Sequence, residues 1–110
     1  MATVVEMARA LGWMVYHTHD SRKSQPGFPD LVLVRDRVVY LECKTATGKL
    51  SLDQQAWIAA ITAAGGTALV VRPADLDRIE DALRKRLTQE TKGSAAAEQD
   101  RAVLPSRKRG

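Results

Sequence analysis

The chain has 110 residues, of which 45% are hydrophobic and 27% charged, and this composition fits one globular domain and excludes fibrous and disordered proteins. Because Cys43 is the only cysteine, an internal disulfide and a zinc site built from several cysteines are excluded. The net charge of +4 permits a polyanionic partner, and since no apolar run suits a signal peptide or a membrane span, we expect a cytoplasmic protein.

The first part of the chain predicts a helix, a strand and a loop. Apolar residues recur at helical spacing over residues 2–11, with Glu6 on the opposite face. Residues 13–17 form a short aromatic and β-branched run typical of a strand. The polar stretch 19–28 contains a Pro-Gly pair and is typical of a loop.

The centre of the chain predicts a β-hairpin. Residues 30–34 and 38–44 are strand-like runs that are separated by a short charged segment of normal hairpin length. A hairpin symmetric about Asp36 places Asp30 opposite Glu42, and a slip of one residue would still leave the two acids close in space.

The following residues predict a helix, a strand and a last helix. Ser51 opens the first of these helices, residues 68–72 look like a buried strand, and Pro73 starts a helix whose last core position is Leu87. The expected fold is therefore α/β, with a mixed central sheet flanked by helices in the order α-β-β-β-α-β-α.

Asp30, Glu42 and Lys44 form the candidate site. Opposed side chains in a hairpin have Cβ atoms about 4.5 to 5.5 Å apart, which suits one divalent cation between two carboxylates, and Lys44 lies on the same side of its strand as Glu42. The neighbouring positions are apolar, so the acidic pair is costly without a counter-ion. Oxygen ligands favour Mg²⁺ or Mn²⁺, and a lysine beside such a metal suits phosphodiester hydrolysis. Taken singly, Asp30 also fits a turn or strand-start residue, and Glu42 and Lys44 also fit an exposed polar stripe on an edge strand.

The segments Gly27-Phe28-Pro29-Asp30, Leu41-Glu42-Cys43-Lys44 and 51–57 occur in an order and spacing that resembles the VRR-Nuc family of the PD-(D/E)xK nuclease superfamily. The resemblance implies a restriction-endonuclease-like core and a Mg²⁺- or Mn²⁺-dependent endodeoxyribonuclease that leaves 5′-phosphate and 3′-hydroxyl ends. It also implies a likeness to Holliday-junction resolvases, which predicts a homodimer that acts on branched DNA in a bacterial or phage-infected cell.

The same resemblance implies roles for the residues of the hairpin. Asp30 and Glu42 would bind the metal, with the backbone carbonyl of Cys43 as a further ligand. Lys44 would position the nucleophilic water.

Gln54 and Glu6 each admit two interpretations. By the resemblance, Gln54 would be the helix glutamine of the site and Glu6 the helix acid near it. However, Ser51 and Gln54 also fit a capping box, in which the glutamine reaches back to the serine, and we expect that one side chain cannot fully meet both roles. Glu6 also fits a solvated helix residue, because it lies opposite the apolar stripe.

Other polar residues are weaker candidates. Arg22 and Lys23 lie in the loop before the hairpin, where they would either contact DNA phosphates or be ordinary charged loop residues. His17 and His19 have no further ligands to support a zinc site.

The leading hypothesis is a structure-selective DNA endonuclease with one domain over residues 1–89 and a flexible basic tail over residues 90–110. Ala56, Ala59 and Ala63 would allow close helix packing, either inside the fold or between subunits. The rival hypothesis is a catalytically silent DNA-binding module or accessory subunit with the nuclease fold. A small structural partner protein would bind neither metal nor DNA.

Overall fold

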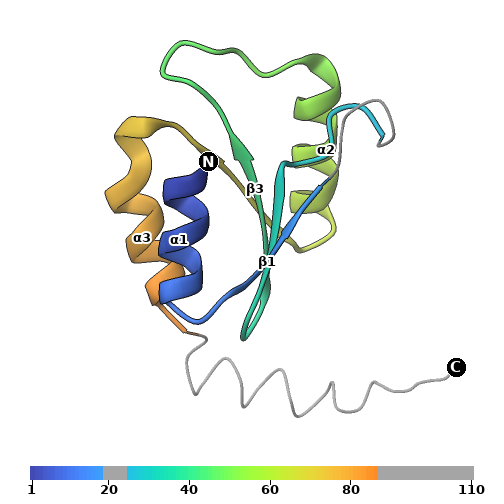
Figure 1. Ribbon diagram of the computed structural model, residues 1–110. Helices are drawn as coiled ribbons and strands as arrows, with labels where there is room; N and C mark the ends of the chain where they lie inside the picture. The colour runs from blue at the N-terminus through green and yellow to red at the C-terminus, as the bar shows by residue number, and fades with distance from the viewer. Residues whose placement is uncertain (19–24, 87–110) are drawn as a thin grey trace, which may run out of the picture.

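The computed structural model describes residues 1–18 and 25–86 and has the expected α/β fold (Figure 1). In chain order its elements are α1 (Ala2–Ala10), β1 (Met14–His17), β2 (Leu31–Val34), β3 (Val38–Cys43), α2 (Leu52–Ala63), β4 (Thr67–Val71), the 3₁₀ turn η1 (Pro73–Asp75) and α3 (Leu76–Arg84). The predicted tail, Arg22, Lys23 and His19 lie outside the described residues. Within the described ranges, no helix is long and apolar enough to cross a membrane.

The four strands form one mixed sheet in the order β1-β2-β3-β4. The first three strands are antiparallel neighbours, and β4 pairs parallel to β3 because α2 carries the chain back to the same end of the sheet. In the hairpin, Leu31 pairs with Leu41 and Val34 with Val38, so the predicted symmetry about Asp36 is confirmed.

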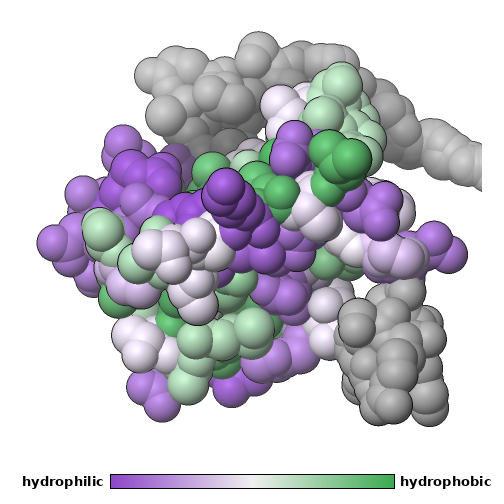
Figure 2. All heavy atoms as spheres, turned by 90° about the horizontal axis from the view of Figure 1, so that it is seen from above, coloured by the Kyte–Doolittle hydropathy of each residue, from purple (hydrophilic) through white to green (hydrophobic). Residues whose placement is uncertain are grey.

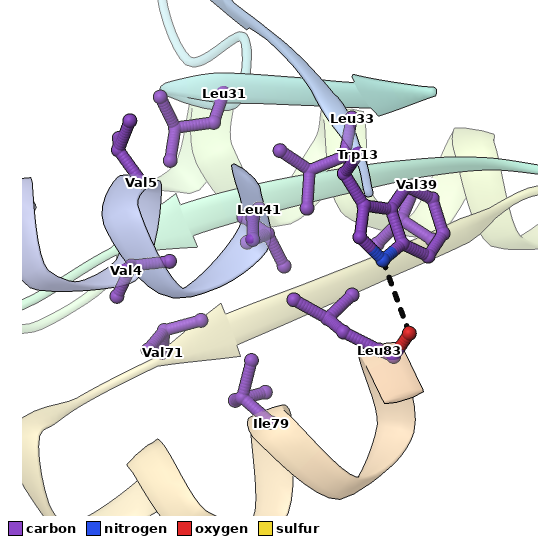
Figure 3. Close-up of a cluster of buried hydrophobic side chains, with 11 residues drawn as sticks. Val4, Val5, Trp13, Leu31, Leu33, Val39, Leu41, Val71, Ile79 and Leu83 are labelled. Carbon is purple, nitrogen blue, oxygen red and sulfur yellow. Dashed lines mark hydrogen bonds between the residues drawn. The ribbon is translucent and has the colours of Figure 1, made fainter. Parts of the chain in front are cut away.

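The hydrophobic core lies on one side of the sheet, beneath α1 and α3, while α2 lies on the other side (Figures 1 and 3). None of the residues of α2 is buried. One face of the sheet is thus covered by α1 and α3, whereas the other face is only partly covered, by α2. The core consists of Val4, Val5, Ala8, Trp13, Leu31, Leu33, Val39, Leu41, Val71, Ile79 and Leu83.

The turn of the hairpin is tied to the end of α3. The buried indole of Trp13 donates from Nε1 to the carbonyl of Leu83 at 3.0 Å (Figure 3). The guanidinium groups of Arg35 and Arg37 lie 4.4 and 5.0 Å from the centre of that indole ring, and both donate to the carbonyl of Lys85. Cations at a helix C-terminus stabilise its free carbonyls, so these contacts hold the hairpin in place.

Two sequence-based expectations are corrected at the C-terminal end. In the predicted buried strand only Val71 is buried, because β4 is an edge strand. The last helix is preceded by the 3₁₀ turn Pro73–Asp75 and ends at Arg84, since Lys85 has extended backbone angles and its carbonyl accepts from the two arginines of the hairpin turn. Leu87 lies outside the described residues.

Candidate active site at the open end of the hairpin

Asp30 lies immediately before β2, where the hairpin register places it opposite Glu42. Its carbonyl accepts from the backbone N–H of Thr18 at 3.0 Å, which continues the β1–β2 ladder by one residue. Its carboxylate Oδ2 accepts from the backbone N–H of Cys43 at 2.9 Å. The aspartate is therefore held on both sides, and its carboxylate lies against the strand that carries the second acid.

Glu42 is the only charged residue in the described chain that is buried, with 3% of its surface exposed. Its Oε2 accepts from Gln54 Nε2 at 2.9 Å, whereas its Oε1 is buried and has no hydrogen-bond partner among the described residues. The pKa of Glu42 is raised to about 7. Burial is the largest cause, and the negative charge of Asp30 adds to it, whereas the positive charge of Lys44 lowers the pKa. A buried carboxylate whose second oxygen has no partner is costly, and a bound cation would stabilise it.

Lys44 directly follows β3 and extends the ladder to β4, because its backbone N–H donates to the carbonyl of Val71 at 2.9 Å. Its Nζ lies 4.0 Å from Glu42 Oε2, at the limit of an ion pair. The predicted placement of the lysine on the same side as the glutamate is thus confirmed. Cys43 lies between them, and burial raises the pKa of its thiol to about 11, so the thiol is protonated at neutral pH.

Gln54 makes the capping contact and a hydrogen bond to Glu42 at the same time, while its part in catalysis stays a prediction. Its Oε1 accepts from the backbone N–H of Ser51 at 2.8 Å, and Ser51 Oγ accepts from the backbone N–H of Gln54, which completes the capping box. Its Nε2 simultaneously donates to Glu42 Oε2. The expectation that one side chain cannot cap the helix and also contact the site is therefore wrong, because the oxygen of the amide accepts in the cap while its nitrogen donates to Glu42.

Gly27 brings the loop before Asp30 against the first turn of α2. Its φ of +89° suits glycine, and an added Cβ would lie 2.4 Å from the backbone carbonyl carbon of Asp53. Next to it, Phe28 packs edge-on against Trp57, with ring centres 5.0 Å apart. These contacts hold the first acid and the glutamine helix together, a role that the Pro-Gly pair alone did not indicate.

Glu6 does not join this group. It is exposed on α1, and no hydrogen bond or ion pair of the described residues connects it to the two acids. Likewise, no cluster of three or more His, Cys, Asp or Glu side chains in the described ranges is arranged to hold a metal. The part of Glu6, and that of the Cys43 carbonyl as a ligand, stay predictions.

The donor set still fits a hard divalent cation. It offers the carboxylates of Asp30 and Glu42, and the buried Oε1 of Glu42 is left without a partner in the described structure. Mg²⁺ commonly takes only one or two carboxylates and keeps several waters, so two acids suffice. A cation there would also remove the repulsion between the two acids.

A comparison with protein-family models matches residues 3–75 to the family described as the VRR-NUC domain. The matched range includes every residue of the candidate site from Glu6 to Gln54. Comparisons with curated proteins and with solved structures found no match.

Proposed function

The chain belongs to the VRR-NUC domain family, which implies a nuclease of the PD-(D/E)xK type, and from this premise we propose that it is a metal-dependent DNA endonuclease. The observation that carries the proposal is the pair Asp30 and Glu42, with a buried and unpartnered carboxylate oxygen beside Lys44. Such a pair is unfavourable on its own and favourable around a cation.

Each residue of the site has a separate role in the proposed reaction. Asp30 and Glu42 would hold Mg²⁺ or Mn²⁺, with the carbonyl of Cys43 as a further ligand. A metal bound there would supply Lewis acidity at the phosphoryl oxygen and would lower the pKa of water. Lys44 orients the attacking water and balances the charge that develops on the phosphoryl group. Gln54, fixed by its capping contact, holds Glu42 Oε2 and leaves Oε1 for the cation.

The substrate that we propose is branched DNA, such as a four-way junction, cut to leave 5′-phosphate and 3′-hydroxyl ends. A homodimer would present two sites to two strands. The partly covered face of the sheet supports self-association. There Met14, Tyr16 and Val34 are 75%, 58% and 42% exposed on adjoining strands.

The charge pattern favours a second copy of the chain on this face over nucleic acid. Residues 54–71, which make up most of α2 and all of β4, contain no charged residue. Ala56, Ala59 and Ala63 are all exposed, so these alanines do not serve close packing inside the fold. DNA needs cations at its contacts, whereas a copy of the same charge-free surface does not.

Self-association is tested by the mass of the full chain in solution. Tyr16→Glu places a charge in the apolar face and is expected to give a monomer by light scattering and to reduce paired cutting of a junction. His17→Glu places the same charge on the neighbouring position, which points to the opposite side of β1, and should leave a dimer intact. A wild-type protein of monomer mass would contradict the dimer and leave the nuclease untouched.

The nuclease itself is tested with labelled four-way junction, flap and linear duplex DNA in Mg²⁺, Mn²⁺ or chelator. Cleavage should need the metal and should be lost in Lys44→Ala while the melting temperature changes little. Lys49→Ala removes an exposed lysine of the nearby connector and should cut like the wild type. Full turnover in Lys44→Ala would refute the assigned chemistry.

A silent DNA-binding module is the second candidate, since the described residues provide two acids and no larger ligand cluster. In that case junction DNA is bound but not cut with either metal at any concentration. The same cleavage experiment, combined with a binding measurement on the same DNA, separates the two candidates.

A further inference from the structure

An open groove lies beside Lys44, where the parallel strands β3 and β4 end. In Figure 1 the end of β3, the start of α1 and the segment that follows β4 meet there, and the groove has a volume of about 230 Å³. Its wall is largely apolar and includes Val4, Cys43 and Val71, and two cationic side chains also line it, Lys44 and Arg72. Ligands of α/β proteins commonly bind outside the carboxyl ends of the strands.

Arg72 is held rigidly at this groove. Its Nη1 donates to the carbonyls of Thr45 and Gly48, at 2.7 and 2.6 Å, and its backbone N–H donates to Asp75 Oδ2 at 3.0 Å. The two carbonyls belong to residues 45–50, the connector that leads from Lys44 to the cap of α2. The arginine therefore has a fixed position relative to the candidate site.

The guanidinium keeps unused donors. Both N–H bonds of Nη1 face the connector carbonyls, whereas Nε and Nη2 have no acceptor, and no carboxylate lies within ion-pair distance of Arg72, among the described residues. Asp75, the nearest acid in sequence, instead pairs with Arg78. Within the described part of the chain, Arg72 thus presents three N–H donors and a positive charge without a counter-ion beside Lys44.

The surface around this end of the molecule presents both hydrophilic and hydrophobic residues, as a site for the phosphate and the sugar of a nucleotide requires. Seen from above in Figure 2, hydrophilic residues run across the middle of the face, with hydrophobic residues exposed among and beside them. Cations suit a phosphate, and an apolar wall such as that formed by Cys43 and Val71 suits the carbon face of a deoxyribose.

We propose that this groove binds a nucleotide of the DNA strand that is cut, with Arg72 donating to the phosphate next to the scissile one and the sugar lying against Cys43 and Val71. The proposal rests on the proposed nuclease function and extends it with a substrate-binding residue outside the acid and lysine motif. Sequence reasoning missed Arg72, for which the only local signal is a lone cation between an apolar strand and Pro73.

The test measures DNA binding by the full chain in chelator, with fluorescence anisotropy as the readout, over a range of salt concentrations. Arg72→Gln should weaken binding about tenfold and reduce the slope of log affinity against log salt by about one, as for the loss of one phosphate contact. Arg78→Gln removes an exposed arginine of α3 that pairs only with Asp75 and should change neither quantity. Arg72→Lys keeps the charge and should recover most of the slope.

The outcomes separate binding from a purely structural role. If Arg72→Gln retains wild-type affinity and salt slope but loses turnover, Arg72 only holds the connector and the proposed phosphate contact is wrong. An equal loss of slope in Arg78→Gln would also overturn it, because the effect would then be non-specific charge. If the wild type binds no DNA at any salt concentration, the proposed function itself fails, and this groove with it.

Discussion

Replacing Glu42 with glutamine tests the electrostatics of the site without any substrate. Burial and the neighbouring Asp30 raise the pKa of Glu42 from 4.5 to about 7. The folded protein therefore binds this proton more tightly than the unfolded chain does, so its contribution to stability is full below pH 4.5 and is lost as the pH rises to 7. The shift corresponds to a loss of about 3 kcal/mol.

Glutamine imitates the protonated acid. Its carbonyl can accept from Gln54 Nε2 and its amide can donate toward Asp30, so the variant keeps the contacts of the low-pH form. We expect Glu42→Gln to match the wild type near pH 4.5 in chelator and to exceed it by about 3 kcal/mol at pH 8. Groups far from Glu42 titrate in both proteins alike, so the difference between them reports on this carboxyl and the charges beside it.

The assay is urea unfolding at pH 4.5, 6 and 8, first in chelator and then with Mn²⁺. Glu80→Gln on α3 is the control, since Glu80 pairs with Arg84 on the surface and should give no such gain with pH. Mn²⁺ should stabilise the wild type at pH 8 and have less effect on Glu42→Gln. A stability difference that stays constant from pH 4.5 to 8 would refute the reasoning.

Substitutions at Gly27, Gln54 and Trp13 probe the contacts that hold the site and the core in place. Gly27→Ala should cost about 3 kcal/mol in thermal unfolding, because its Cβ would meet the backbone of Asp53, whereas Gly65→Ala, with a similar φ and nothing within 4 Å, should cost about 1 kcal/mol. Equal costs would contradict the close approach. Gln54→Ala should lower both cleavage and stability, and Gln54→Glu, which keeps the helix cap but sets a carboxylate against Glu42, should also lower both at pH 8; full activity in both variants would remove Gln54 from the site. Trp13→Phe loses the hydrogen bond to Leu83 and should destabilise by about 2 kcal/mol in urea, a value near zero arguing against that bond.

Much of the fold could be predicted because it rests on local patterns. Alternating apolar residues on both sides of a charged turn allow one good register, and a slip of one residue would move Leu31 and Leu41 out of the core. That register alone sets Asp30 opposite Glu42. The cap at Ser51 is likewise a short-range hydrogen-bond pattern, which is why the start of α2 was predictable.

Other features depend on elements that are far apart in the chain. The contact of Gln54 with Glu42 requires α2 to lie at a particular distance from β3, and the end of α3 depends on arginines of the hairpin turn that bind Lys85. Neither the position of α2 nor the end of α3 is encoded in a local sequence pattern. The same holds for Arg72, whose fixed position comes from carbonyls more than twenty residues earlier.

The sequence by itself determined the order of elements, the hairpin register and the acid, acid and lysine set, because side-chain alternation and turn chemistry act between near neighbours. Only the tertiary structure decided that Glu42 is buried with one free oxygen, that Gln54 both caps a helix and binds this acid, and that one sheet face stays partly open. Burial and charge interaction depend on what packs around a group, and that is settled only when distant segments meet.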